Sequence, residues 1–474
     1  MPRHIAEPPP GRDRTERNMN RTFFFDTARL PAGWRRNVRV TVRAGLICEV
    51  ACGAAAAPED LRLALALPGV PNLHSHAFQR AMAGLAERRG PRGTDDFWSW
   101  REVMYRFLER LDPDDLQVIA TYTYADLLEA GFTSVGEFHY LHRDPRGSLY
   151  QDPAELALRH AAAADATGIG LTLLPVFYES SQFGAVAPTA GQRRFITDLE
   201  EFERISARIR TAVPTSGARN VGIAPHSLRA VTAAHLARLL EQHPLGPVHI
   251  HAAEQMKEVE DCVAFTGLRP VEWLLRHAHI DERWCLVHAT HLTDAETTEL
   301  AHSGAVAGLC PVTEANLGDG IFPSLAYAQA AGRWGIGTDS HIRLDAAGEL
   351  RQLEYAQRLA HRARTVLARS DQPSSGASLL EAAWRGGAQA LALPVGAIAS
   401  GCRADFIGLD AQHPDLTGRT TDSAIDTWVF ASGRSLIKDV IAGGEHVVEN
   451  GRHQDRDRID AAYRRTLSRL LQTA

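Results

Sequence analysis

The sequence predicts an α/β protein: a (β/α)8 TIM-like barrel with a small composite β-sandwich domain built from both chain ends. Eight short apolar segments alternate with helical patterns through the middle of the chain, which is the arrangement of parallel β/α units. Ionisable residues stand at the same end of many of these segments. Segments with β-strand character, interrupted by proline and glycine, lie near both ends of the chain.

The composition is that of an ordinary globular protein. The chain has 474 residues, of which 45% are hydrophobic and 23% charged, with a formal net charge of −6. This length suits one large catalytic domain and a smaller one. The negative net charge does not indicate a basic surface for nucleic acid, and no apolar run reaches membrane-spanning length. We therefore expect neither a nucleic-acid partner nor a membrane partner.

The cysteines and the N-terminal segment predict a cytoplasmic protein. The six cysteines are spread along the chain without C-x-x-C spacing, which is typical of reduced core thiols. Residues 1–20 are polar and proline-rich and lack the apolar core of a signal peptide. We expect this segment to be a disordered tail.

The rest of the chain divides into three predicted regions. The β-like pieces at 21–69 and 395–455 are expected to form the small β-domain together, and residues 70–394 are expected to form the barrel. Residues 456–474 are expected to form a C-terminal helix.

The barrel strands are expected where short apolar runs are bounded by turn residues. Their predicted ranges are 70–76, 133–140, 170–177, 220–227, 247–253, 284–290, 305–311 and 333–339. Helical patterns such as 113–131 and 233–243 separate them. Eight such units close naturally into a barrel, whose active site lies at the C-terminal ends of the strands. A doubly wound open sheet is the alternative, but it would spread the strand-end residues along an edge.

The first predicted strand carries the pattern His-X-His, at His74 and His76. Alternate residues of a strand point to the same face, so the two imidazoles would meet at one point. Imidazole is a common ligand of zinc and similar metals, although such a pair alone can also be an ordinary strand end. His251 in the fifth strand and Asp339 in the eighth would complete a set of three imidazoles and a carboxylate.

Two residues near this set are candidates for proton transfer. Glu254 lies three residues beyond His251, a spacing that allows it to stand over the metal as a proton shuttle without binding it. His288, in the sixth strand, is expected to hydrogen-bond a metal-activated hydroxide, with His291 as a weaker competitor. Each residue alone could be an ordinary core or surface residue, but together they predict a catalytic metal centre.

With these residues, the sequence resembles the amidohydrolase superfamily. The resemblance rests on His-X-His in strand one, the stretch HIHAAEQ in strand five, His288 in strand six and Asp339 in strand eight. It implies the barrel, the flanking β-domain and a metal-dependent hydrolase that acts on a C–N bond. Members with two metals carry a carboxylated lysine at the end of strand four, where this chain has APHSLR. One divalent ion per chain, expected to be Zn²⁺, is the better interpretation.

Within the superfamily, the chain is similar to the N-formimidoyl-L-glutamate deiminase family of histidine degradation. This similarity runs from about residue 21 to about 455 and rests on NLHSHAFQRAMAG, DFWSWREVMYRFLERL, GFTSVGEFHYLH, GIAPHSLRAV, HIHAAEQ and TDSHIRLD. It implies deimination of N-formimidoyl-L-glutamate to N-formyl-L-glutamate and ammonia by a metal-activated hydroxide. It also implies a homodimer.

Residue by residue, the resemblance assigns three kinds of position. The metal ligands would be His74, His76, His251 and Asp339, the catalytic residues Glu254, His288 and Asp339, and the substrate contacts Gln79, Arg101, Tyr140, His226 and Arg229. The substrate of this family is a dicarboxylate, and guanidinium groups bind carboxylates bidentately. Arg106 competes with Arg101, because it lies little more than one helical turn further along.

Two other functions stay open at this point. A mononuclear deaminase or chlorohydrolase acting on a purine, pterin or triazine would need aromatic groups around its ring, such as those in DDFWSW. A barrel kept as a binding or scaffold protein is the non-enzymatic alternative, but such proteins typically lose metal ligands. A substrate panel would separate the enzymes, and measurement of bound metal would test the non-enzyme.

Overall fold

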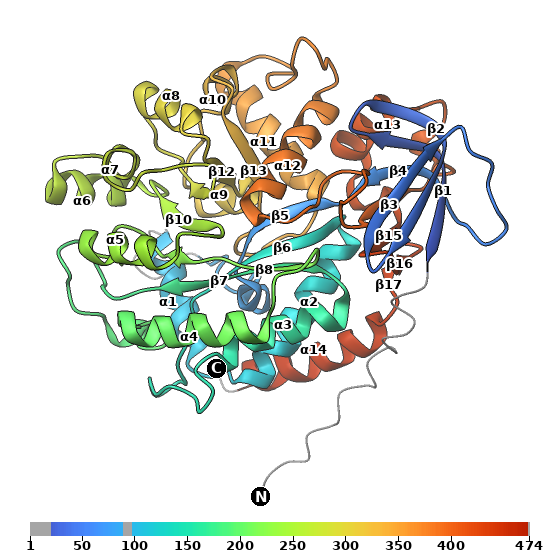
Figure 1. Cartoon of the computed structure of the whole chain (residues 1–474). Helices are drawn as coiled ribbons and strands as arrows, with labels where there is room; N and C mark the ends of the chain where they lie inside the picture. The colour runs from blue at the N-terminus through green and yellow to red at the C-terminus, as the bar shows by residue number, and fades with distance from the viewer. Residues whose placement is uncertain (1–19, 89–96, 473–474) are drawn as a thin grey trace, which may run out of the picture.

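The computed structural model describes residues 20–88 and 97–472. A mixed eight-stranded sheet lies at one side of a larger body in which helices surround parallel strands (Figure 1). The predicted tail at 1–20 lies outside the described residues except for Asn20.

Strands from both ends of the chain form the eight-stranded sheet, which confirms that part of the fold prediction. Its order is β17-β16-β15-β14-β4-β1-β2-β3. The strands are β1 (Arg21–Leu30), β2 (Gly33–Arg43), β3 (Leu46–Cys52), β4 (Leu61–Pro68), β14 (Phe406–Leu409), β15 (Ile437–Ala442), β16 (Glu445–Glu449) and β17 (Arg452–His453). β4 joins the two halves, since it pairs in parallel with β1 and antiparallel with β14. The rings of Phe23 and Phe25 pack edge-on against Phe406, with centroids 5.4 and 5.1 Å apart.

The central strands form two parallel sheets. One contains β5 (Val70–Ser75), β6 (Phe132–His139), β7 (Gly170–Phe177), β8 (Arg219–Val221) and, paired with β7, β9 (Ala224–Pro225). The other contains β10 (Val248–Ala252), β11 (Trp284–His288), β12 (Val306–Leu309) and β13 (Arg333–Ile336). Single bridges join Ser75 to Asp339 and Ile223 to Val248, so the two sheets meet at both edges.

Each predicted central strand overlaps an observed one, but the fourth is divided into β8 and β9. Gly222 lies in the gap, and a Cβ atom on it would lie 2.4 Å from the carbonyl oxygen of Pro247. Close packing of two backbones therefore interrupts the pairing at this position. Leu73 of β5 packs in the same close manner against Gly308 and Gly335, where a Cβ would lie 3.0 and 2.7 Å from its side chain.

Helices follow most of the strands. They are α1 (Phe97–Leu108), α2 (Pro113–Glu129), α3 (Glu155–Thr167), α4 (Leu199–Ala212), α5 (Ala233–Gln242), α6 (Met256–Thr266), α7 (Pro270–His277), α8 (Asp294–His302), α9 (Pro311–Leu317), α10 (Ser324–Gln329), α11 (Ala346–His361), α12 (Ser375–Leu391), α13 (Asp422–Thr427) and α14 (Arg456–Leu471). α2 begins with a side-chain cap, in which Asp112 accepts a hydrogen bond from the Asp115 N–H, and with Pro113 in its first turn. α14 packs on α2 through stacked rings of Tyr122 and Tyr463.

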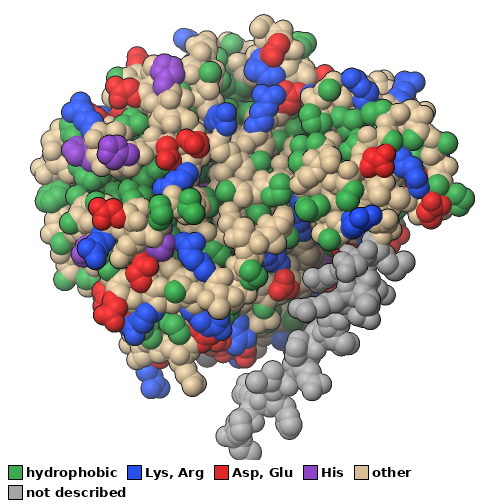
Figure 2. Space-filling model, in the orientation of Figure 1, with side chains coloured by type: hydrophobic (Ala, Val, Ile, Leu, Met, Phe, Trp, Pro, Cys, Tyr) green, Lys and Arg blue, Asp and Glu red, His purple; other side chains and the backbone are tan. Residues whose placement is uncertain are grey.

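The surface seen in Figure 2 carries acidic and basic side chains interspersed with each other. Within the described ranges, no helix combines the length and the apolar character that a membrane span requires.

Candidate active site

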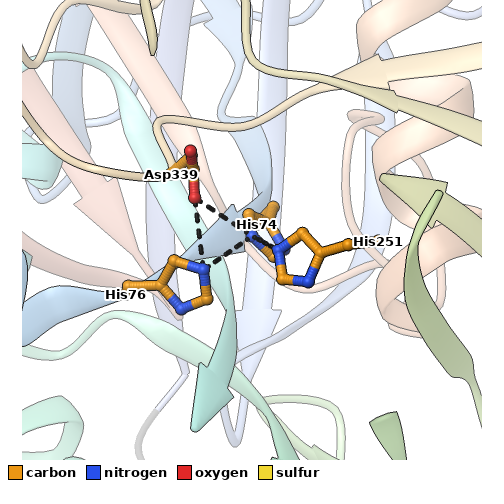
Figure 3. Close-up of side chains that lie close together, drawn as sticks. All are labelled: His74, His76, His251 and Asp339. Atoms are coloured by element: carbon orange, nitrogen blue, oxygen red, sulfur yellow. Dashed lines mark hydrogen bonds and ion pairs between the residues drawn. The ribbon is translucent and has the colours of Figure 1, made fainter. Parts of the chain in front are cut away.

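Four side chains converge at the ends of the parallel strands (Figure 3). The Nε2 atom of His74 lies 3.2 Å from Nε2 of His76 and 3.2 Å from Nε2 of His251. Oδ1 of Asp339 lies 3.2 Å from Nε2 of both His74 and His76. All four residues are buried. Three ring nitrogens and one carboxylate oxygen around a single point form a donor set that a divalent metal requires, so the predicted metal site is confirmed.

The backbone holds these ligands in place. His74 lies within β5 and His76 directly follows it, while His251 lies in β10. Asp339 is tied to the end of β5, since its N–H donates to the carbonyl of His74 and its own carbonyl accepts from the His76 N–H, both at 3.1 Å. Its φ angle of 42° is in the left-handed region, a conformation that a non-glycine residue keeps only where its surroundings impose it.

Hydrogen bonds to carbonyl groups orient two of the imidazoles. Nδ1 of His76 donates to the carbonyl of Phe138 at 2.9 Å, and Nδ1 of His251 donates to that of His226 at 3.2 Å. A carbonyl can only accept, so Nδ1 carries the hydrogen and Nε2 turns its lone pair to the centre.

Burial prepares the site for a cation. It lowers the pKa of His74 to about 3 and that of His251 well below its ordinary value, so these rings are neutral at pH 7. Burial would raise the pKa of Asp339, but the contacts of its carboxylate with His74 and His76 bring it well below its ordinary value. The resulting neutral imidazoles and anionic carboxylate fit a divalent cation.

Glu254 and His288 lie beside the ligand cluster. Nε2 of His288 lies 3.7 Å from Oε1 of Glu254, and its Nδ1 lies 3.3 Å from Oε1 of Glu314. Burial would lower the pKa of His288, but the charge of Glu254 and the hydrogen bond with Glu314 raise it to about 10. Burial raises the pKa of Glu254. The two residues therefore form a pair that can hold and exchange a proton next to the cluster.

One pocket contains this pair and three of the four ligands. All predicted substrate contacts line the same pocket: Gln79, Arg101, Tyr140, His226 and Arg229. Of the competing candidates, Arg101 and His288 line the pocket, whereas Arg106 is exposed on α1. His291 is not among the lining residues; its ring packs next to Gly320.

Several residues of the pocket were not predicted from the sequence. Tyr105, Tyr178 and Phe195 line it, and Glu258 and Glu314 are buried next to it. Tyr178 directly follows β7, so the rule that active sites lie at strand ends could have identified it. Glu258 has a weaker signal, because it follows Glu254 by four residues and lies in the first turn of α6. No local pattern identifies Glu314.

Comparison with known proteins gives consistent results along the chain. Residues 65–447 match the family described as "Amidohydrolase family", and residues 21–64 match "Formimidoylglutamate deiminase HutF, N-terminal domain". A formimidoylglutamate deiminase from Pseudomonas aeruginosa is 50% identical over 451 residues, which cover 95% of this chain and 99% of that protein.

Solved structures agree with these matches. An amidohydrolase from Brucella melitensis superposes with a TM-score of 0.92 at 49% identity, covering 95% of this chain and 100% of the other. An adenosine deaminase from Xanthomonas campestris with bound zinc superposes with a TM-score of 0.79 at 23% identity, covering 96% of this chain and 98% of the other. At that lower identity the likeness concerns the fold alone.

Proposed function

The chain belongs to the amidohydrolase family and, within it, to the formimidoylglutamate deiminases, and we propose that its pocket converts N-formimidoyl-L-glutamate to N-formyl-L-glutamate and ammonia. The observation that carries this proposal is the composition of the pocket. A metal-ligand cluster with an acid–base pair lies at one end, and two arginines, Arg101 and Arg229, line the same cavity. An amidine and two carboxylates on one small molecule match these two ends.

We propose zinc as the resident ion. Three imidazoles and one carboxylate are typical zinc ligands, and such a set leaves room for water or substrate. When bound, the ion supplies the Lewis acidity that brings the pKa of water to about 7.

A second ion is not part of the proposal. The group His288, Cys310 and Glu314 brings its donor atoms within 4.8 Å of one another, but burial raises the pKa of the Cys310 thiol well above its ordinary value. A metal binds the thiolate and not the thiol. Oε1 of Glu314 is also engaged, because it accepts from the Cys310 N–H at 2.8 Å.

Glu254 and His288 are proposed to move the protons of the reaction. Glu254 accepts a proton from the water that attacks the formimidoyl carbon, and returns it to the nitrogen that leaves as ammonia. His288, whose pKa of about 10 keeps it protonated, stabilises the charge that develops on the attacking oxygen. Asp339 orients the water and takes up its second proton as the carbonyl group forms, and this proton leaves with the ammonia as ammonium. The carbon–nitrogen bond then breaks and the N-formyl product remains.

Gln79 is proposed to hold the amidine. Its amide nitrogen donates to the hydroxyl oxygen of Tyr140 at 2.9 Å, and its Oε1 is buried without a hydrogen-bond partner among the described residues. A buried acceptor of this kind requires a donor, and the N–H groups of an amidine provide one. Arg101, Arg229 and His226 would bind the glutamate part, where each guanidinium can take one carboxylate in a bidentate manner.

We extend the proposal to the architecture. The bridges between the two parallel sheets and the packing of Leu73 against Gly308 and Gly335 support closure into one (β/α)8 barrel. We propose that this barrel spans 70–394 and that 21–69 and 395–455 form the β-sandwich domain, whose side chains share a separate core. A cytoplasmic location is supported by six free cysteines. The homodimer stays a prediction from the family resemblance.

An ammonia-release assay tests the proposed function. Zinc-loaded protein would be assayed with N-formimidoyl-L-glutamate, N-formimidoyl-L-alanine, adenosine and an aminotriazine. We expect formimidoylglutamate to react with the highest kcat/KM, and N-formyl-L-glutamate to appear in equal amount to ammonia. Faster deamination of either ring compound would contradict the proposal, as would release of formamide in place of ammonia.

A further inference from the structure

Tyr178 occupies a position in the pocket to which the predicted site assigns no role. It follows β7, is 4% exposed, and lines the pocket together with Arg101 and Arg229. Its ring packs edge-on against His226 with centroids 4.7 Å apart, and lies tilted against Phe195 with centroids 5.8 Å apart. The ring is therefore held by its neighbours, and its hydroxyl group can form a directed contact with a ligand.

The side chain of Gln192 has one possible orientation. This residue is fully buried at the end of a short helix, η3 (Ala190–Gln192). Its Oε1 accepts from the backbone N–H of Thr189 at 2.8 Å and from the Thr189 hydroxyl at 3.1 Å. A backbone N–H can only donate, so the atom facing it is the amide oxygen and not the amide nitrogen.

This orientation sets the direction of the next hydrogen bond. The amide nitrogen of Gln192 donates to the hydroxyl oxygen of Tyr178 at 2.7 Å. Burial raises the pKa of Tyr178, so the phenol keeps its own hydrogen at neutral pH. Gln192 is the hydrogen-bond partner of that hydroxyl among the described residues, and the phenolic hydrogen is left for a ligand in the pocket.

The pair formed by Gln79 and Tyr140 provides an internal comparison. There too an amide nitrogen donates to a phenolic oxygen, at 2.9 Å, but the Tyr140 hydroxyl lies 3.3 Å from Sδ of Met104, to which it donates. Tyr178 has the same kind of donor behind it, and within residues 20–88 and 97–472 its hydroxyl has no such acceptor. Charges of Arg229 and Arg101 act on the Tyr178 hydroxyl, the former more strongly, so the groups that attract an anion surround it.

Resting on the proposed function, we propose that Tyr178 is a specificity-determining substrate-binding residue, whose phenolic O–H donates to the substrate carboxylate that Arg229 binds. Gln192 is then a positioning residue that acts through Tyr178. A neutral donor adds a directed contact to a carboxylate without adding a third positive charge to a buried pocket.

Truncated substrates provide the direct test. Zinc-loaded wild type and Tyr178→Phe would be assayed with N-formimidoyl-L-glutamate and two analogues, N-formimidoyl-4-aminobutanoate and N-formimidoyl-L-2-aminobutanoate, each of which lacks one carboxylate. Loss of a hydrogen bond to a charged group should lower kcat/KM for formimidoylglutamate about 10- to 100-fold, mainly through KM. With the analogue that keeps the carboxylate bound by Tyr178, the variant should show the same loss of kcat/KM. With the analogue that lacks this carboxylate, wild type and variant should have similar kcat/KM.

Gln192→Glu tests the positioning role in a side chain of nearly the same shape. Its carboxylate still accepts from the Thr189 N–H, but it also accepts the phenolic hydrogen and so turns it away from the pocket. We expect this variant to lose kcat/KM for formimidoylglutamate, and to lose clearly less when Tyr178 is already phenylalanine. This non-additivity is a readout that a purely structural role of Gln192 would not give.

Tyr463→Phe, in α14 and outside the pocket lining, serves as the matched control and should behave as wild type. An equal loss by Tyr178→Phe on all three substrates, or no loss, would overturn the inference and leave the proposed function intact. Additive effects in the double variant would overturn the role of Gln192. If Tyr178→Phe does not fold, Gln192→Glu with Tyr178 in place is assayed on the same three substrates, and an equal loss on all three would overturn the inference. Absence of turnover by the wild type would instead overturn the proposed function, and the inference with it.

Discussion

The metal-binding end of the pocket lies at the ends of buried parallel strands, whereas the end that we propose to bind the substrate carboxylates is built from a helix and loops. His74 and His251 belong to strands, and backbone hydrogen bonds tie Asp339 to β5. Arg101 comes from α1 and Arg229 from the segment that follows β9. In the proposed function, the strands thus supply a rigid frame for the chemistry, and the more variable connections supply the recognition of the substrate.

The two ends are also prepared for opposite charges. Burial lowers the pKa of His74 to about 3, which leaves a neutral ligand for a cation. Burial would likewise lower the pKa of Arg229, but the charge of Glu258 raises it. A guanidinium that stays charged inside the protein attracts an incoming carboxylate. Variants at the metal-binding end should therefore lose metal or turnover, whereas variants at the other end should lose affinity for the substrate carboxylates.

The largest effect is expected from loss of a metal ligand. His74→Ala or Asp339→Ala should lose the metal and the activity together, because Lewis-acid stabilisation of several kcal/mol corresponds to about a 1000-fold loss or more. Metal analysis and ammonia release measure the two quantities. His302→Ala, exposed on α8, should change neither. Full metal content in an Asp339→Ala protein would remove this residue from the ligand set.

Glu254→Gln should separate chemistry from metal binding at the same end. The amide cannot carry the proton, so kcat should fall by about 10²- to 10⁴-fold while the metal remains bound. Glu260→Gln, on the exposed side of α6, is the control. Turnover near that of wild type would reduce Glu254 to a structural role, and loss of metal would identify it as a ligand.

Arg229→Met should damage only the carboxylate-binding end. Loss of one charge-assisted contact should lower kcat/KM for formimidoylglutamate by roughly 10- to 100-fold, with the metal retained. The variant should also discriminate less between formimidoylglutamate and N-formimidoyl-L-alanine, which we expect to be a poor substrate of the wild type. Arg276→Met, on the exposed face of α7, controls for the loss of one positive charge. Unchanged discrimination would contradict the division of the pocket into two ends.

The smallest effect on activity is expected at His142, a buried histidine outside the pocket lining. Burial lowers its pKa from 6.5 to about 4. Between these values the unfolded chain binds more protons than the folded one, so this residue reduces stability as the pH falls from 6.5 toward 4. In His142→Asn, the loss of unfolding free energy across this window should be shallower, by at most about 1.4 kcal/mol per pH unit.

Thermal or urea unfolding of wild type and variant at pH 7 and pH 5 measures this difference. The metal contributes to both proteins, so the comparison isolates His142. His302→Asn should keep the slope of wild type. A His142→Asn protein with the same acid sensitivity as wild type would assign that sensitivity to other groups, among them the buried histidines of the metal end.

The strands and the metal end were predictable from the sequence because both depend on local patterns. Short apolar runs between turn residues indicated the central strands, and the His-X-His spacing places two imidazoles on one face of a strand. The order of strands along a parallel sheet then brought His251 and Asp339 to the same point, although 177 residues separate His74 from His251. The sequence did not predict the interruption of the fourth strand, because this interruption depends on the approach of Pro247 to Gly222.

The carboxylate-binding end was decided by the tertiary structure. Arg101 and Arg106 lie on one helix, and only the packing of α1 places the former in the pocket and leaves the latter exposed. Nothing in the local sequence relates Gln192 to Tyr178, because their contact depends on how an irregular loop folds back over β7. The sequence by itself determined the positions of side chains on regular strands, such as His74 and His76, because alternate residues of a strand share a face. Loops have no such period, so the position of each loop side chain follows from packing and hydrogen bonds between distant segments, which only the folded chain contains.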